Sequence, residues 1–162
     1  MAAWQFDLVL IPRASLAGRL KDGEDRFESS VFEALDWWVG FTLPPDYQRR
    51  LEAILPWSVP WDPEWKVFGV EDGNRIDVLT EAGQVKEVRA RIDARDLDAD
   101  FVERLIEFAD YCACVFVTPE LRVIEPDLHA IWVELELSPA SSFIRDPSRF
   151  LERLGRRSTE RP

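Results

Sequence analysis

The stretch WKVFGVEDGNRIDVLTEAGQVKEVRARID, residues 65–93, decides the fold of this chain. It contains three short runs of strand-forming residues, and EDGN and EAGQ separate them. Asp-Gly or Gly between two such runs is typical of β-hairpins. We therefore predict an antiparallel meander of three strands over residues 65–93.

The alternation of side chains predicts how the last two strands of the meander pair. A three-residue loop, Glu81-Ala82-Gly83 with Gly83 left-handed, would place Ile76 opposite Val88 and Leu79 opposite Val85. An even-length loop would instead set Ile76 against a charged residue such as Arg89. The three-residue loop is expected because it keeps charges off the buried face. The other face, exposed to solvent, would then carry Arg75, Asp77, Glu87, Arg89, Arg91 and Asp93.

Three more apolar runs extend the expected sheet outward from the meander. Strand formers dominate near residues 4–12, 112–118 and 121–125. The chain is therefore expected to have an α+β fold, in which helices pack on one face of an antiparallel sheet. Residues 1–155 are expected to form a single domain, and residues 156–162 a disordered tail.

Apolar residues at helical spacing occupy the segments between these strands. The clearest helix is predicted over 97–110, with Asp98 as its cap. The segment 127–144 fits both periods. A helix that kinks or restarts near Pro139 is favoured there over a strand, because Pro126-Asp127 suits a helix start. The other expected helices cover 27–41, 43–55 and 146–157.

Charge narrows the class of partner. The 162 residues carry a net charge of −11, and residues 61–130 alone carry −9. Nucleic acids and anionic membrane surfaces attract cationic proteins, so neither is an expected partner. A protein with a basic surface is compatible with this field. The sequence has no signal-peptide pattern and no apolar run of about 20 residues, so the expected compartment is the cytoplasm.

The segment PWSVPWDPEW, residues 56–65, contains three tryptophans and three prolines. Proline removes a backbone donor and clashes with the preceding turn, so a continuous helix is not expected here. Two interpretations of this irregular segment stay open. The favoured one places its rings on the sheet as part of the core, since tryptophan is highly buried on average. The other is an exposed platform for a protein partner or a sugar.

Patterns that carry chemistry are scarce in the sequence. Cys112 and Cys114 would share one side of a strand, but a zinc site needs four ligands and His129 is the only other soft candidate. Buried free thiols are therefore expected, with no metal and no cofactor. The sequence has no phosphate-binding glycine loop and no G-x-S-x-G motif.

Three stretches carry a resemblance: WQFDLVLIP (4–12), EDGNRIDVLTEAGQVKEVRARID (71–93) and FIRDPSRFLERL (143–154). They resemble segments of small uncharacterised bacterial proteins of the toxin-immunity type, which are encoded beside secreted toxins and act by binding them. The resemblance implies a non-catalytic inhibitor of a protein partner. It implies no role for any single residue.

The expected function is that of a non-catalytic, cytoplasmic protein-binding protein, an immunity-type inhibitor of a basic partner. Two alternatives stay open. One is a small hydrolase or isomerase that uses carboxylates such as Asp77, Glu87 or Asp93, and the other is a homodimeric scaffold subunit. No catalytic residue is assigned. The expected partner-binding residues are Trp57, Trp61, Trp65, Glu71, Asp72, Asp77, Glu87 and Asp93.

Overall fold

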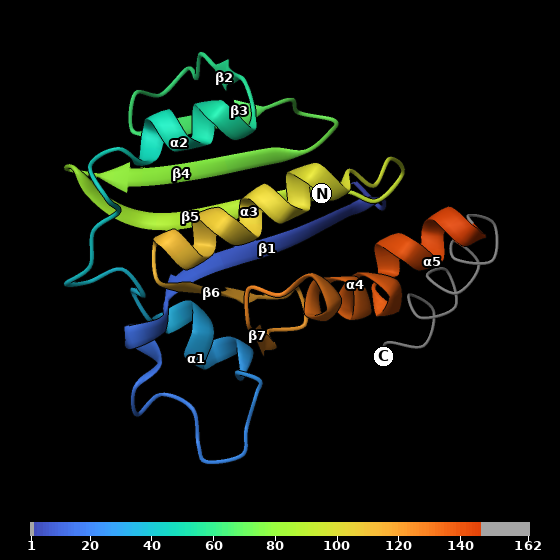
Figure 1. Ribbon diagram of the computed structural model, residues 1–162. Coiled ribbons are helices and arrows are strands. Elements are labelled where there is room, and N and C mark those ends of the chain that lie inside the picture. Colours follow the sequence, from blue (N-terminus) through green and yellow to red (C-terminus); the bar gives the residue numbers. More distant parts are fainter. Residues whose placement is uncertain (1, 147–162) are drawn as a thin grey trace, which may run out of the picture.

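The computed structural model describes residues 2–146. Its centre is a seven-stranded antiparallel sheet in the order β2-β3-β4-β5-β1-β6-β7 (Figure 1). The sheet confirms the predicted α+β fold, and β3, β4 and β5 are the predicted meander. The strands are β1 (Gln5–Pro12), β2 (Trp57–Ser58), β3 (Trp65–Gly69), β4 (Arg75–Glu81), β5 (Gln84–Asp93), β6 (Cys114–Val117) and β7 (Val123–Ile124).

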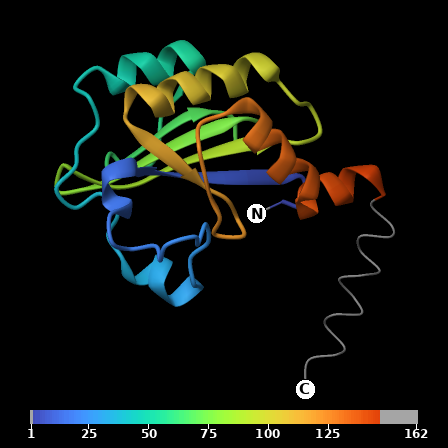
Figure 2. The same ribbon diagram turned by 60° about the horizontal axis from the view of Figure 1, so that its bottom comes forward.

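Helices cover one face of this sheet, and a shorter helical segment lies on the other. Figure 2 shows α2 and α3 above the sheet and α1 below it. We call the side of β1, β3, β4 and β5 that faces away from α2 and α3 the open face. The helices are α1 (Ser29–Ala34), α2 (Tyr47–Ile54), α3 (Ala99–Tyr111), α4 (Leu128–Leu137) and α5 (Pro139–Arg145), and a 3-10 turn spans Arg13–Leu16.

The predicted caps of the C-terminal helices are confirmed. The Asp98 carboxylate accepts a hydrogen bond from the backbone N–H of Phe101 at 3.1 Å and begins α3. The segment 127–144 is helical, as favoured. It restarts at Pro139, which occupies the first turn of α5 behind the capping residue Ser138. The expected helix over 146–157 and the expected tail over 156–162 lie outside the described residues, apart from Asp146, which ends α5.

The helix expected over 27–41 is wrong beyond Ala34. The chain becomes extended at Leu35, and both of the following indoles turn into the core. Trp38 donates its indole N–H to the backbone oxygen of Leu10 at 3.2 Å, and Trp37 donates to that of Phe32 at 3.1 Å. Burying these two rings outweighs local helical periodicity, because each buries a large apolar surface. Similarly, α2 begins only at Tyr47, after two consecutive prolines.

Most of the core lies between the helices and one side of the sheet, and a smaller part, which includes Trp38, lies on the α1 side. Alternate residues of the central strands face α3 and are fully buried, among them Leu8, Ile76 and Val88. Phe101 and Leu105 of α3 belong to the same hydrophobic cluster. This cluster unites the described residues, because every strand from β3 to β7 and β1 contributes to it. Within residues 2–146 no helix is long and apolar enough to cross a bilayer.

The predicted loop and register of the β4–β5 hairpin are wrong. Ile76 faces Ala90 instead of Val88, and Val85 faces Thr80 instead of Leu79. The loop has two residues, Ala82 and Gly83, at φ values of 49° and 77°. A two-residue turn that matches the right-handed twist of the two strands requires positive φ at both of its residues.

A bulge reconciles the short loop with a buried apolar face. The two-residue turn alone would set Ile76 opposite Arg89. The register shifts by one residue between Leu79 and Thr80, which leaves Lys86 of β5 without a direct partner. Beyond this bulge, the apolar residues of β4 lie opposite apolar residues of β5. Charged residues are therefore kept off the buried face, as expected, but the extra residue lies in β5 and not in the loop.

The expectation that the tryptophans of 56–65 belong to the core is wrong, because none of the three belongs to the hydrophobic cluster. The side chain of Trp61 is 85% exposed and that of Trp57 is 38% exposed. Trp57 packs edge-on against Phe68 at the β2 edge, on the helix side of the sheet. Trp65 is half-buried on the open face. The buried indoles of this half of the chain are instead Trp37 and Trp38.

Substituting Gly69 tests the hairpin geometry between β3 and β4. Gly69 has φ of +96°, and a Cβ atom there would collide with the backbone oxygen of Asn74. We expect Gly69→Ala to lower the free energy of unfolding by more than about 3 kcal/mol, because strain and a backbone clash add. Gly40→Ala is the matched control, since Gly40 has φ of +80° but open space around it. It should cost only about 1–2 kcal/mol in urea unfolding. Equal losses for the two variants would contradict the close approach.

Candidate functional site

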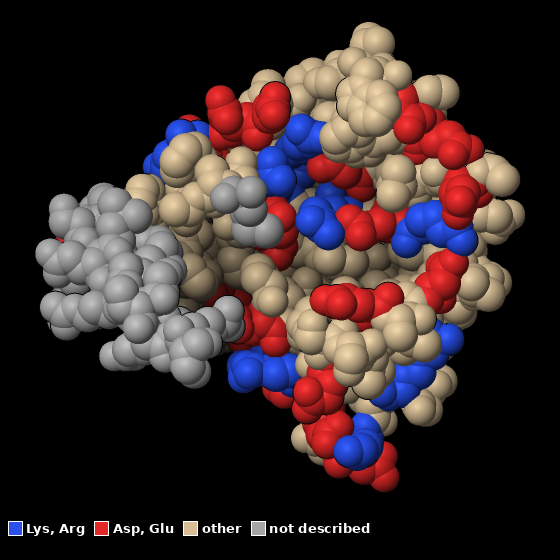
Figure 3. All heavy atoms as spheres, turned by 180° about the vertical axis from the view of Figure 1, so that it is seen from behind, with Lys and Arg blue, Asp and Glu red and all other residues tan. Residues whose placement is uncertain are grey.

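The open face of the sheet is hollowed. A depression of about 610 Å³ lies over β3, β4, β5 and the start of β1. Figure 3 shows this side of the molecule, where basic and acidic side chains edge the hollow in alternation. We call this depression the sheet hollow. The residues that line it and enter the argument below include Trp65, Arg75, Asp77, Glu87, Arg89 and Arg91.

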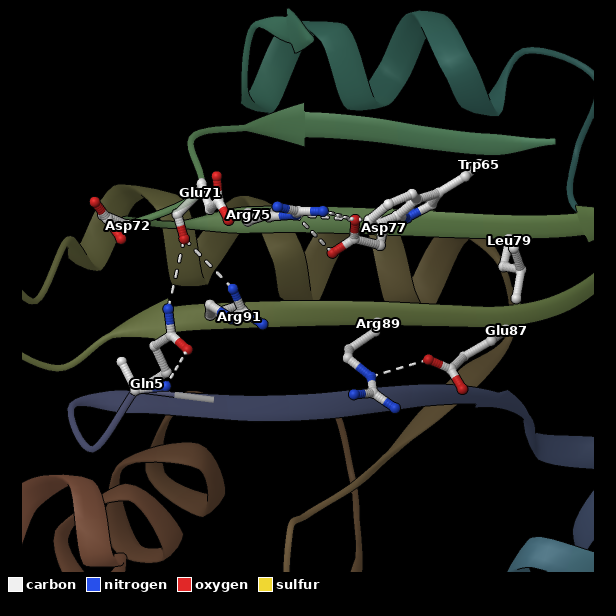
Figure 4. Close-up of a pocket in the computed structure, with 11 residues that line it drawn as sticks. Gln5, Trp65, Glu71, Asp72, Arg75, Asp77, Leu79, Glu87, Arg89 and Arg91 are labelled. Atoms are coloured by element: carbon white, nitrogen blue, oxygen red, sulfur yellow. Dashed lines mark hydrogen bonds and ion pairs between the residues drawn. The ribbon is translucent and has the colours of Figure 1, made fainter. Parts of the chain in front are cut away.

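Strand alternation places these side chains together. Successive side chains of a strand point to opposite faces, so every second residue of β4 and β5 reaches the open face. Their neighbours Ile76, Val78, Val88 and Ala90 point into the core. In Figure 4 the labelled side chains of β4 and β5 rise from one side of the sheet, with the helices behind it.

A three-residue cluster forms one wall of the sheet hollow. Arg75 donates hydrogen bonds of 2.8 and 2.9 Å to the carboxylate of Asp77. The indole N–H of Trp65 donates to the same carboxylate at 2.9 Å. The Arg75 guanidinium also lies over the Trp65 ring, 5.1 Å from its centroid. Because its lone pairs are already occupied, Asp77 holds neighbouring side chains in place and has little free capacity for a substrate proton.

A second cluster surrounds a buried carboxylate of β1 that is paired with the arginines of the hollow. Asp7 of β1 is only 5% exposed. Arg91 pairs with its Oδ1 atom at 3.1 Å, whereas the Nη1 atom of Arg89 lies 3.8 Å from Oδ2. Arg89 is closer to Glu87, with 2.9 Å between Nε and Oε1. Among the described residues, Asp7 Oδ2 receives no hydrogen bond. A buried acceptor left in this state costs about 1–3 kcal/mol.

A second depression adjoins the sheet hollow. It has a volume of about 490 Å³, lies between the α1 segment and the sheet, and shares Glu87 and Arg89 with the hollow. We call it the α1 groove. Lys86 closes one end through a 2.6 Å contact between its Nζ and the Oδ2 of Asp36. This hydrogen bond lowers the pKa of Asp36 and raises the pKa of Lys86.

Two exposed apolar side chains lie in the loop between β2 and β3, which leads to the hollow residue Trp65. Val59 is 89% exposed, and Trp61 packs edge-on against Trp65 with 6.1 Å between ring centroids. Trp61 therefore extends the aromatic surface of the hollow outward into solvent. We call Val59 and Trp61 the apolar rim.

Five of the eight predicted binding residues line the sheet hollow: Trp65, Glu71, Asp72, Asp77 and Glu87. Trp61 lies on the rim next to them. Trp57 does not belong to this surface, because it lies on the same face of the sheet as Phe68, which is the face covered by α2 and α3. Asp93 is buried at the end of β5, where Arg95 binds it at 2.8 and 3.0 Å.

The sequence interpretation missed the cationic half of the site. Arg75, Arg89 and Arg91 were placed on the right face but were not counted as binding residues. The alternation that placed them was itself a sufficient signal. Asp7 was also missed, although a single acidic residue inside the apolar run WQFDLVLIP is a sign of a specific buried partner.

The cysteine and histidine side chains, which are the soft metal ligands of this chain, do not line the sheet hollow. Cys114 is buried and Cys112 half-buried, and burial raises the pKa of both thiols to about 12. Both are therefore free thiols that stay protonated at neutral pH, as expected of inert buried cysteines. His129 is exposed on α4. Among residues 2–146, no group of three or more His, Cys, Asp or Glu side chains is placed to hold a metal ion.

The Asp77 cluster gives a stability prediction. We expect Asp77→Asn to lower the free energy of unfolding by about 1–3 kcal/mol, because Arg75 and Trp65 lose a charged acceptor. Asp100→Asn is the control, since its pair with Arg104 on α3 is 72% exposed on the Asp side and should contribute less than about 0.5 kcal/mol. Urea unfolding of both variants measures the difference. A loss for Asp77→Asn no larger than that of the control would show that the cluster is not held as described.

Asp93 gives a pH prediction. The hydrogen bond from Arg95 lowers the pKa of Asp93 from the ordinary 3.8. The stabilisation is therefore fully present above pH 3.8 and is lost as the pH falls below it, through the lowered pKa of the folded state. We expect Asp93→Asn to be less stable than wild type at pH 7, and the gap to narrow in acid. Urea unfolding between about pH 5 and about pH 2 tests this. A gap that is constant over this range would be the contrary result.

Neither a family model, a curated protein nor a solved structure matches this chain. What the protein does has therefore to be inferred from the arrangement of its own side chains.

Proposed function

We propose that this chain is a non-catalytic, cytoplasmic protein-binding protein, an immunity-type inhibitor whose partner has a basic surface. The partner would lie across the sheet hollow and the apolar rim. One observation carries the proposal: Trp61 stands 85% exposed at the edge of a hollow whose polar side chains are already fixed to one another.

The apolar rim supports a protein as the ligand. Tryptophan is enriched among the residues that dominate binding energy at protein interfaces. Trp61 and Val59 expose almost their full surface to water, and each would gain by contact with an apolar patch. The edge-on contact with Trp65 positions the Trp61 ring before any partner arrives. A side chain fixed in advance loses less conformational freedom on binding.

The charges of the hollow support binding more than catalysis. Asp77 is held by Arg75, Asp7 by Arg91, and Glu87 by Arg89. Paired carboxylates of this kind shape a surface, whereas a general base needs a free lone pair directed at a substrate. This pairing gives the carboxylate-dependent hydrolase or isomerase less support than a binding protein.

The field around the hollow supports a basic partner. Glu71 and Asp72 are exposed at the turn between β3 and β4, at one end of the hollow. Residues 61–130, which include this turn, carry a net charge of −9. An excess of negative charge of this kind attracts a basic partner and speeds its association at low salt.

The test uses the product of the adjacent reading frame, because immunity-type proteins are encoded beside their targets. We expect it to bind the purified chain, with an association rate that falls as salt rises. Trp61→Ala should weaken binding by about 30-fold or more, in keeping with an interface hot spot. Leu137→Ala on α4, a residue that is 75% exposed, is the matched control and should change little. Stopped-flow mixing and calorimetry give the two quantities.

Two results would contradict the proposal. One is the lack of any complex with that protein at micromolar concentrations. The other is a complex that forms at a salt-independent rate and is affected equally by Trp61→Ala and Leu137→Ala.

A further inference from the structure

We propose that the α1 groove receives one cationic side chain, a lysine or an arginine, from the partner protein. This inference rests on the proposed function and specifies the chemistry of one contact within it. It arises from three properties of the groove: its apolar walls, its excess of acidic groups, and the half-satisfied carboxylate of Asp7.

The walls of the α1 groove suit the hydrocarbon stem of such a side chain. Phe32 and Leu35 form the α1 side, and Val9 lies on the sheet side. Lysine and arginine bury their methylene stems against apolar surface while the charged end keeps polar contacts. The groove, at about 490 Å³, has ample room for one side chain of this length.

The charges around the groove favour a cation. The acidic side chains that line it or contact its lining are Asp7, Glu33, Asp36, Glu81 and Glu87. The basic ones are Arg19, Lys86, Arg89 and Arg91. Acidic groups therefore outnumber basic groups, and Lys86 is already paired with Asp36 at 2.6 Å. A positive charge added to the groove reduces its excess of negative charge and is therefore attracted, whereas a negative charge added there is repelled.

Asp7 supplies the specific contact. Its Oδ1 atom is paired with Arg91 at 3.1 Å, but Oδ2 receives no hydrogen bond within residues 2–146. Arg89 is the nearest cation to Oδ2, and the 3.8 Å separation is too long for a hydrogen bond. Buried polar atoms are nearly always hydrogen-bonded, so this atom has the capacity to accept a further hydrogen bond from a donor that enters the groove.

Arg89 is then a competitor for Asp7 and not the binding group. In the free protein Arg89 contacts both carboxylates, with 2.9 Å between Nε and Glu87 Oε1 and 3.8 Å between Nη1 and Asp7 Oδ2. Asp7 Oδ2 is shielded from solvent, so the incoming cation would reach it by displacing the Arg89 guanidinium. Removing Arg89 should strengthen cation binding. Removing the charge of Glu87 should weaken it, because Arg89 would then turn to Asp7. A site for an anionic ligand, in which Arg89 makes the contact, would respond to these changes with the opposite signs.

The first experiment uses small probes that mimic the side chains: n-propylguanidinium for arginine and n-butylammonium for lysine. Butyrate and 1-butanol are the controls for charge and for apolar contact. Titrations are followed by ¹H–¹⁵N spectra, with the indole N–H of Trp37 and the backbone amides of Val9 and Val117 as reporters, since all three residues line the groove. We expect saturable shifts with the two cations only. Equal shifts with butyrate or butanol would overturn the inference.

Variants then locate the contact. Asp7→Asn should weaken cation binding about tenfold, as expected for loss of one charge-assisted hydrogen bond. Asp100→Asn removes the same charge from α3, far from the groove, and should leave binding unchanged. Arg89→Met should strengthen binding roughly three- to fivefold, and Glu87→Gln should weaken it. Unchanged or weaker binding by Arg89→Met overturns the inference even if Asp7→Asn does not fold.

The probes need no partner protein, so the two proposals fail separately. If the cations do not bind and the partner does, this inference is wrong and the proposed function stands. If the cations bind as expected but the basic partner does not, the groove is a cation site and the proposed function is wrong.

Discussion

One extra residue in β5 keeps the two sides of the sheet distinct. The two-residue turn at Ala82-Gly83 would by itself set Ile76 against Arg89, and the bulge at Lys86 corrects this by one position. Because strand side chains alternate, the same correction sends Arg89 and Arg91 to the open face and Val88 and Ala90 into the core. The hollow, its arginines and the packing under α3 all depend on this single irregularity. The bulged residue is also used, since Lys86 reaches across to Asp36 and ties the α1 segment to the sheet.

The open face has a polar but ordered surface because its acids and bases are matched in space. Asp77 and Asp7 would be costly to bury alone, and each has an arginine within 3.1 Å. Such pairs add little net stability compared with apolar residues, but they hold side chains in defined positions. The match is incomplete at Asp7 Oδ2 and at Arg89 Nε, two buried atoms that make no hydrogen bond among the described residues. Both residues line the α1 groove.

Much of the fold could be predicted from sequence, because local signals agreed with the final packing. The meander, the Asp98 cap and the restart at Pro139 follow from turn, capping and proline chemistry that acts within a few residues. The predictions that failed depended on distant contacts. The helix predicted over 27–41 ends early because Trp37 and Trp38 are buried against β1. The hairpin register depends on a bulge that no particular residue type in the sequence indicates. For the site, alternation brought most of the acidic residues and the arginines to one face. Asp7 could not be matched to Arg91 without knowing that β1 pairs with β5.

The interior position of β1 bears on how the chain is made. It leaves the ribosome before either of its neighbours, because β5 and β6 both lie later in the sequence. Until these are synthesised, FDLVLI remains an unpaired apolar ribbon whose backbone groups are open to any other strand. The nascent protein therefore passes through a long interval of exposure to self-association, in which a holding chaperone would be of direct benefit. A sheet whose central strand pairs only with later segments of the chain folds slowly, because its contacts are distant in sequence, but its centre is buried and well paired.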